Sequence, residues 1–176
     1  MLEIRLSGFG GQGMITGGII LADAALKEGK KAVQSQSYGP EARGGASKAE
    51  VIISTEDIDY PKVNEPNILL AMSQEACDKY ISSLRDDGIL IVDSSYVKNI
   101  PATNAKVYAV PITDYAREKL GKVIVANIVA LGVLVGITDA VSKKALETAV
   151  LNRVPKGTEE LNRKALAAGF QLAKEL

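Results

Sequence analysis

The stretch that decides the fold is residues 2–13, LEIRLSGFGGQG, which leads directly into an apolar run that begins at Met14. Apolar and charged residues alternate through its first half, a pattern typical of a strand, and the glycine cluster that follows predicts a tight turn. From Met14 to Lys27 the apolar residues fall mostly on one helical face, and Gly29 is placed to end that helix. We therefore predict a strand, a turn and a helix, followed by a second short strand over residues 31–36.

The rest of the chain continues this alternation of strands and helices. Residues 89–93, ILIVD, form a continuous apolar run typical of a strand that is buried on both faces of a parallel sheet. Further strands are predicted over residues 49–54, 68–72 and 106–110, and helices over residues 73–84, 113–120, 124–137, 142–152 and 158–176. No linker or internal repeat divides the sequence, so residues 1–176 are expected to form a single α/β domain. We expect it to be Rossmann-like, with a mostly parallel sheet and a helical C-terminal cover.

The composition excludes several classes of function. The charges balance, with 21 Lys and Arg against 21 Asp and Glu, and the lysine pairs at 30–31 and 143–144 have no aromatic residues interleaved with them. We therefore expect neither a nucleic-acid nor a membrane partner. The sequence contains no histidine and one cysteine, Cys77. This excludes Ser-His-Asp and Cys-His catalysis, histidine-containing zinc sites, and an iron–sulfur cluster bound by about four cysteines.

Two further observations bear on location. The first residues contain no basic stretch followed by an apolar run, so no signal peptide is expected and a cytoplasmic protein is the default prediction. The apolar stretch 123–137 contains Asn127 and is shorter than the roughly 20 residues of a membrane span, which favours a buried helix. Its Gly132 and Gly136 have a spacing that lets a helix lie close to a sheet.

The glycine turn is the first candidate binding site, and it contains Gly8, Gly10, Gly11, Gln12 and Gly13. Between a strand and a helix, a G-x-G-x-x-G motif lets the backbone approach a pyrophosphate, and the free N–H groups at the helix start attract an anion. Gln12 adds a side chain that can both donate and accept hydrogen bonds. A purely structural role, in which the glycines only permit close packing, is the alternative interpretation.

A nicotinamide dinucleotide site would also need an acidic residue at the end of the second strand, to hold the ribose hydroxyls. The sequence has Gln34, Ser35 and Gln36 there instead, and the nearby acids Asp23 and Glu28 belong to the predicted helix. The missing acid argues against a stand-alone dinucleotide-binding protein, which stays open as an alternative function.

A second turn-rich segment directly follows the second predicted strand, which places it at the carboxyl edge of the sheet beside the glycine turn. Its Arg43 is a candidate clamp for a phosphate or carboxylate, and its Tyr38 is either a ligand contact or a lid that packs the loop down. The alternative interpretation is that Glu41 and Arg43 are ordinary solvated charges in a turn and bind no ligand. The candidate site residues of this segment are Ser37, Tyr38, Gly39, Pro40, Glu41, Arg43, Gly44 and Gly45.

Together the two loops resemble the gamma subunit family of 2-oxoacid:ferredoxin oxidoreductases. The family's opening motif G-x-G-G-Q-G matches residues 8–13, and its second signature S-Y-G-P-E-A-R-G-G matches residues 37–45 without a gap. The resemblance extends over essentially the whole chain. The run Glu41 to Gly45, in a chain without histidine, is most similar to the 2-oxoglutarate branch, and pyruvate and indolepyruvate are the alternative substrates.

The resemblance implies a non-autonomous subunit of a hetero-oligomeric enzyme that oxidatively decarboxylates 2-oxoglutarate to succinyl-CoA. Such a complex uses thiamine diphosphate, magnesium, an iron–sulfur cluster and coenzyme A, and it passes its electrons to ferredoxin. The implied partners are alpha and beta subunits, with a ferredoxin-like delta subunit as a further candidate. No catalytic residue, metal ligand or complete cofactor site is expected in this chain alone.

The resemblance leaves two roles open for the paired loops. In the first they form part of a pocket over the thiamine and coenzyme A sites, with Arg43 and the amides of Gly10–Gly13 facing an anionic group. In the second they make only the contact that orders the catalytic subunits. Because obligate interfaces are apolar, we also expect the isolated chain to self-associate.

Three other features have competing structural interpretations. Residues 86–88, DDG, lack the first glycine of the G-D-G motif of thiamine enzymes, which favours a turn between a helix and a strand. Cys77, near the start of a predicted helix, is either a reactive thiol or a buried apolar residue, and the second interpretation is favoured. Asp93, at the end of a strand, is a candidate ligand for a metal or a hydroxyl, although no second acid lies at a fixed spacing.

Overall fold

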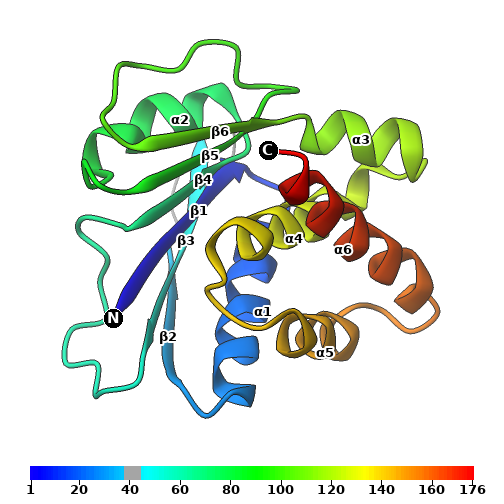
Figure 1. Ribbon diagram of the computed structural model, residues 1–176, viewed down its shortest axis with the longest axis horizontal. Helices are drawn as coiled ribbons and strands as arrows, with labels where there is room; N and C mark the ends of the chain where they lie inside the picture. The colour runs from blue at the N-terminus through cyan, green and yellow to red at the C-terminus, as the bar shows by residue number, and fades with distance from the viewer. Residues whose placement is uncertain (38–44) are drawn as a thin grey trace.

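The computed structural model describes residues 1–37 and 45–176, and this part of the chain is organised around one sheet (Figure 1). The strands are β1 (Leu2–Phe9), β2 (Lys31–Gln36), β3 (Ala46–Ser54), β4 (Ile68–Ala71), β5 (Ile89–Asp93) and β6 (Lys106–Val110). Their order across the sheet is β2-β3-β1-β4-β5-β6. The pairs β1–β4, β4–β5 and β5–β6 are parallel, whereas β3 is antiparallel to both β1 and β2.

The prediction of a mostly parallel sheet is confirmed, and β3 is its exception. β3 follows β2 in the sequence and pairs with it in the opposite direction, so it runs back between β2 and β1. In a dinucleotide-binding fold the second strand of the first βαβ unit lies beside the first strand. Here β3 separates the end of β2 from the glycine turn. This adds a structural argument against the dinucleotide alternative.

The helices cover the two faces of the sheet unequally. They are α1 (Met14–Lys27), α2 (Gln74–Tyr80), α3 (Ile112–Lys119), α4 (Ala126–Thr138), α5 (Lys143–Arg153) and α6 (Glu159–Lys174), with short 3₁₀ turns η2 (Ile81–Ser83) and η3 (Val123–Val125). In Figure 1, α1, α4, α5 and α6 gather on one side of the sheet and α2 lies on the other. The predicted helical C-terminal cover is therefore confirmed. Within the described ranges, no helix is long and apolar enough to cross a membrane.

Alternation along β1 explains why both faces are covered. Ile4 and Leu6 are buried in the large cluster that contains α1 and α4, whereas Arg5 points to the α2 side and reaches Ser83. Most of α4 is buried, and it contacts α1, α3, α5 and α6. A helix that is apolar around nearly its whole circumference belongs in the centre of a core.

Four predicted elements agree with the structure at both ends, and the others differ at one or both ends. The bounds of α1, β2, β5 and β6 are those predicted. β3 begins at Ala46 rather than at residue 49, because Ala46 pairs with Phe9 of β1. The helix predicted over residues 73–84 ends at Tyr80 and continues as η2, and the helix predicted from residue 124 begins as η3.

The close helix packing predicted from Gly132 and Gly136 exists, but its partner is another helix and not the sheet. A Cβ on Gly132 would lie 2.9 Å from the Cα of Gly169, and a Cβ on Gly136 would lie 2.6 Å from the Cβ of Ala173. Both contacts are with α6. The spacing itself signals a close approach but not its partner, because small residues allow either packing.

Candidate functional site

The first glycine loop closes a tight turn between β1 and α1. The N–H of Gln12 donates to the carbonyl of Phe9 (3.3 Å), and Gly11, at the third position of this turn, has a φ of 91°. Gly13, with a φ of 78°, immediately precedes α1. Both glycines occupy the left-handed region that other residues rarely adopt, so the backbone itself requires them. Gly10 is exposed.

The side chain of Gln12 holds this loop in place. Its amide oxygen accepts a hydrogen bond from the N–H of Phe9 (2.6 Å), and its amide nitrogen donates to the carbonyl of Met72 (3.1 Å), just beyond β4. Gly8 packs against it, since a Cβ on Gly8 would collide with the same amide oxygen. The oxygen and the nitrogen of the Gln12 amide thus each have one partner within the chain. Gln12 acts as a positioning residue for the loop.

The N-terminus of α1 opens at this loop. α1 has no side-chain cap and no acidic residue in its first turn, and the first N–H groups of a helix have no partner within it. Asn127, in the first turn of α4, packs against Gly13, where a Cβ would lie 2.5 Å from the Asn127 amide nitrogen. An anion here would meet the positive end of the helix dipole near an amide donor. From sequence alone Asn127 only interrupts an apolar run, because its contact with Gly13 is tertiary.

The described ends of the second loop lie at the same edge of the sheet as the first loop. The N–H of Ser37 donates to the carbonyl of Lys48 (3.3 Å), and Gly45 precedes β3, which pairs with β1 as far as the glycine loop. The hydroxyl of Ser47 donates to the carbonyl of Gly8 (3.2 Å). The Gly45 end therefore meets the first loop at this edge of the sheet, and the Ser37 end is held against β3, one strand away.

Six candidate residues of the second loop lie outside the described residues, and their role stays a prediction. They are Tyr38, Gly39, Pro40, Glu41, Arg43 and Gly44. Next to them, the buried hydroxyl oxygen of Ser37 has no hydrogen-bond partner in the part of the chain that the structure describes. A buried polar group of this kind is one that a ligand can satisfy.

An apolar cavity of about 140 Å³ lies at the same edge. The rings of Phe9 and Tyr96 meet edge to face with their centres 5.5 Å apart, and Phe9 and Ile124 are 41% and 82% exposed. Exposed apolar side chains gathered around a glycine loop are typical of a binding surface. Tyr96 and Ile124 belong to no local motif, so the sequence did not single them out. The lining residues are Phe9, Gly11, Gln12, Met72, Tyr96, Thr113, Val123, Ile124 and Ala126.

Asp93 has a structural role at this edge. Its carboxylate is fully buried and accepts hydrogen bonds from the hydroxyl of Thr113 (2.5 Å), the N–H of Thr113 (3.3 Å) and the N–H of Ser95 (3.0 Å). These bonds join the end of β5 to the start of α3. The carboxylate oxygens are thus already engaged, which argues against the predicted alternative of a metal or hydroxyl ligand.

No group of side chains among the described residues fits an iron–sulfur cluster. Across residues 1–37 and 45–176, no group of three His, Cys, Asp or Glu side chains is placed to hold a metal. Cys77 is buried, and burial foremost, with a contribution from Asp78, raises the pKa of its thiol to about 11. Asp87 pairs with Arg85 (2.9 Å) in a turn before β5. The interpretations of Cys77 as a buried apolar residue and of residues 86–88 as a turn both agree with this geometry.

The chain is similar to known proteins over nearly its whole length. The family model described as pyruvate ferredoxin/flavodoxin oxidoreductase matches residues 3–172. The chain belongs to this family. It is 53% identical to the 2-oxoglutarate synthase subunit KorC of Methanocaldococcus jannaschii over 177 residues, which cover 99% of this chain and 95% of that protein.

Solved structures of the family have the same fold. The keto/oxoacid ferredoxin oxidoreductase gamma subunit from Geobacter sulfurreducens is 52% identical, with a TM-score of 0.91 and 100% of both chains covered. The resemblance to gamma subunits of oxidoreductases, drawn from the two glycine-bearing loops, is thereby confirmed. The same domain also occurs within longer proteins. The ketoisovalerate oxidoreductase subunit VorA of Methanothermobacter thermautotrophicus is 32% identical over 99% of this chain but only 37% of its own length.

Proposed function

We propose that this chain is the gamma subunit of a 2-oxoglutarate:ferredoxin oxidoreductase. The observation that carries the proposal is the likeness to KorC over nearly the full length of both proteins. The reaction converts 2-oxoglutarate, coenzyme A and oxidised ferredoxin to succinyl-CoA, carbon dioxide and reduced ferredoxin. The site of action that we propose is the cytoplasm.

Other chains hold the catalytic cofactors in this proposal. Thiamine diphosphate with magnesium supplies the decarboxylation chemistry of such an enzyme, and an iron–sulfur cluster carries its electrons. The described residues offer neither a cluster site nor a metal site, which supports assigning these groups to alpha, beta and ferredoxin-like delta subunits. This chain contributes a subunit boundary and no catalytic residue.

The carboxyl edge of the sheet faces coenzyme A in this proposal. The amides of Gly10–Gly13 and of the first turn of α1 bind an anionic group of the coenzyme, and Gln12 holds these amides in position. Arg43 adds a positive charge from the second loop. The open start of α1, the Asn127 amide beside Gly13 and the meeting of both loops at one edge support this arrangement.

Tagged purification of the chain from its native host tests the assignment. The partners are identified by mass spectrometry, and the eluate is assayed for coenzyme A-dependent dye reduction with 2-oxoglutarate, pyruvate and indolepyruvate. Recovery with thiamine- and cluster-bearing subunits, together with activity on 2-oxoglutarate, is the expected result. Activity on pyruvate or indolepyruvate alone would assign the chain to another branch of the family. Recovery without any such subunit would contradict the proposal.

Replacement of Arg43 by alanine in the assembled complex tests the role of the second loop. Loss of a charge-assisted hydrogen bond, about 1.5–3 kcal/mol, corresponds to a KM for coenzyme A that rises at least about tenfold. Lys174→Ala, which removes a positive charge at the end of α6, is the matched control and leaves the KM unchanged. An Arg43→Ala complex with normal coenzyme A dependence would leave assembly as the function of this loop.

A further inference from the structure

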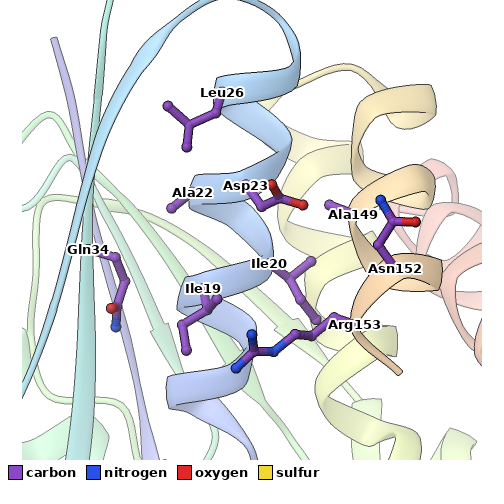
Figure 2. A pocket seen from close by; sticks show the side chains of 9 residues that line it. All are labelled: Ile19, Ile20, Ala22, Asp23, Leu26, Gln34, Ala149, Asn152 and Arg153. Carbon is purple, nitrogen blue, oxygen red and sulfur yellow. The ribbon is translucent and has the colours of Figure 1, made fainter. Parts of the chain in front are cut away.

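A cavity of about 410 Å³ between α1, β2 and α5 lies outside both glycine loops. Figure 2 shows that aliphatic side chains of α1 form much of its wall, with polar side chains from α1, β2 and α5 around them. The lining residues are Ile19, Ile20, Ala22, Asp23, Leu26, Gln34, Ala149, Asn152 and Arg153. Nothing in the proposed function uses this surface.

The cavity continues toward the candidate site. A second cavity of about 210 Å³ shares Arg153 with it, and shares Ile124 with the cavity at the glycine loop. Leu26 lines the first of these cavities and Ile124 lines the second, and their side chains are 55% and 82% exposed. The cavities of about 410 and 210 Å³ are together called the α1–α5 groove, and they extend the apolar surface that begins at Phe9.

Arg153 places an unmatched positive charge in this groove. In Figure 2 its side chain extends from α5 toward α1, beside Ile19 and Ile20. No hydrogen bond or ion pair joins the side chain of Arg153 to another group in residues 1–37 and 45–176. The neighbouring Asp23 pairs instead with Lys27 (3.4 Å). The other arginines in those ranges, Arg5, Arg85, Arg117 and Arg163, all pair with a carboxylate.

We propose that the α1–α5 groove receives a segment of a partner subunit whose carboxylate pairs with Arg153 and whose apolar side chains fill the cavities on either side. This inference rests on the proposed function, because it requires partner subunits. Arginine within an apolar patch is typical of the central part of a protein interface, where a charge is bound by a complementary one. The occurrence of this domain within the longer VorA chain supports a protein occupant, since other parts of that chain accompany the domain.

Site-specific cross-linking in the assembled complex identifies the occupant. A photoreactive benzoylphenylalanine replaces Leu26 in one tagged variant and Asn152 in another, and each complex is purified from the native host, irradiated, digested and sequenced by mass spectrometry. Both positions should cross-link to one segment of one co-purifying subunit, and that segment should contain Asp or Glu flanked by apolar residues. Cross-links to a second copy of this chain, or to none, would overturn the proposal.

Charge reversal tests the contact itself. Arg153→Glu should lower the recovery of that subunit at least about tenfold, because like charges then face each other in a desolvated site. Lys144→Glu makes the same charge change in the first turn of the same helix, outside the groove, and should leave the recovery within about twofold. Replacing the cross-linked acid of the partner by lysine should restore the recovery of Arg153→Glu. The thermal midpoint of the full chain should fall by no more than about 4 °C in Arg153→Glu, because the reversed charge meets the C-terminal end of the α5 dipole.

The two proposals fail in different ways. If wild-type chain recovers the thiamine- and cluster-bearing subunits and Arg153→Glu recovers them equally well, the groove assignment is wrong and the proposed function stands. If wild-type chain recovers none of these subunits, both proposals are wrong. A lysine in place of the partner-subunit acid that restores assembly with Arg153→Glu but not with Arg153→Ala would support the direct ion pair.

Discussion

Gly132 of α4 and Gly169 of α6 touch backbone to backbone where the two helices cross. A Cβ on Gly132 would lie 2.9 Å from the Cα of Gly169, and a Cβ on Gly169 would lie 2.7 Å from the Cα of Gly132. Any side chain at either position would therefore push the helices apart. Because α4 is the buried centre of the helical layer, this crossing governs how α4 and α6 pack over the sheet.

Gly169→Ala should destabilise the chain by about 1–3 kcal/mol or more, because the added methyl group overlaps backbone atoms that cannot move independently. Gly17→Ala is the matched control in α1, where a Cβ would lie 3.6 Å from Leu6 and 3.7 Å from Leu131, in ordinary contact. Because alanine favours a helix interior over glycine, Gly17→Ala should raise the free energy of unfolding by up to about 1 kcal/mol. Urea unfolding followed by circular dichroism measures both. Equal stability of the two variants would show that the helices separate at little cost.

Glu28 should make the stability of the chain depend on pH below about 4.5. Its carboxylate accepts a hydrogen bond from the N–H of Ser142 (2.6 Å) and pairs with Lys30 (2.9 Å), which ties the end of α1 to the start of α5. Hydrogen bonding from Ser142 is the main cause that lowers the pKa of Glu28 from 4.5 to about 2; burial opposes it, and Lys30 adds to it.

A lowered pKa in the folded state fixes the sign of this effect. The contribution of Glu28 is fully present above pH 4.5 and is lost as the pH falls from there toward 2. The free energy of unfolding, measured in urea between pH 3 and pH 6, should therefore fall less steeply with acid in Glu28→Gln than in wild type. Parallel curves for Glu28→Gln and wild type would contradict the assignment.

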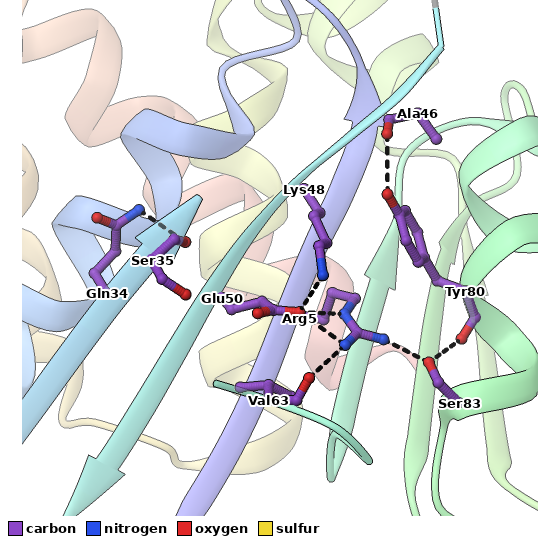
Figure 3. A network of polar contacts seen from close by, with 9 residues as sticks. All are labelled: Arg5, Gln34, Ser35, Ala46, Lys48, Glu50, Val63, Tyr80 and Ser83. Atoms are coloured by element: carbon purple, nitrogen blue, oxygen red, sulfur yellow. Dashed lines mark hydrogen bonds and ion pairs between the residues drawn. The ribbon is translucent and has the colours of Figure 1, made fainter. Parts of the chain in front are cut away.

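A buried ion pair between Arg5 and Glu50 joins β1 to β3 (Figure 3). Their side chains are 5% and 7% exposed and lie 2.7 Å apart, and Arg5 also donates to the carbonyl of Val63 and to the hydroxyl of Ser83. Burial, the largest influence on Glu50, raises its pKa, but hydrogen bonds from Lys48 and Arg5 outweigh burial and lower the pKa overall. Glu50 is therefore the charged partner that this face of the sheet requires.

Removing one partner of this pair should lower the free energy of unfolding by more than the intact pair adds to it. Glu50→Ala leaves the Arg5 charge buried, at a cost of about 3–5 kcal/mol in the free energy of unfolding. Glu147→Ala breaks the exposed pair with Arg163 and should cost no more than about 1 kcal/mol. Arg5→Met combined with Glu50→Leu should recover much of the loss. Chemical denaturation of the three proteins is the measurement, and a Glu50→Ala variant as stable as Glu147→Ala would show that water reaches Arg5.

Local patterns predicted the elements of this fold better than their arrangement. The bounds of α1 follow from apolar periodicity and from Gly29, whose φ of 74° ends the helix, and both are local properties. The position of β3 between β2 and β1 follows from pairing across the sheet, which leaves no local mark. The packing of Gly132 against α6, and not against the sheet, is likewise a tertiary contact that no local pattern predicts.

The candidate site divides in the same way. The glycines of the first loop were predicted as a turn, and the φ angles of Gly11 and Gly13 show why the backbone needs them. Asn127 and Tyr96 reach the same edge only through folding, so no motif marks them. Gln12 was predicted as a hydrogen-bonding side chain of a cofactor-binding or subunit-boundary loop, and in the structure its amide bonds to Phe9 and Met72. Sequence identifies the residue type, but the assignment of each hydrogen bond needs the structure.

Gln12→Ala should separate a positioning role from a direct ligand role. It removes the hydrogen bonds to Phe9 and Met72, so the chain should lose about 1–2 kcal/mol of stability, and the KM of the complex for coenzyme A should rise as the loop loosens. Gln74→Ala is the matched control, because its side-chain oxygen likewise accepts from the N–H groups of Lys98 (2.9 Å) and Asn99 (3.0 Å). It should lose similar stability with an unchanged KM. A higher KM for Gln12→Ala at wild-type stability would instead mean that Gln12 touches the coenzyme directly.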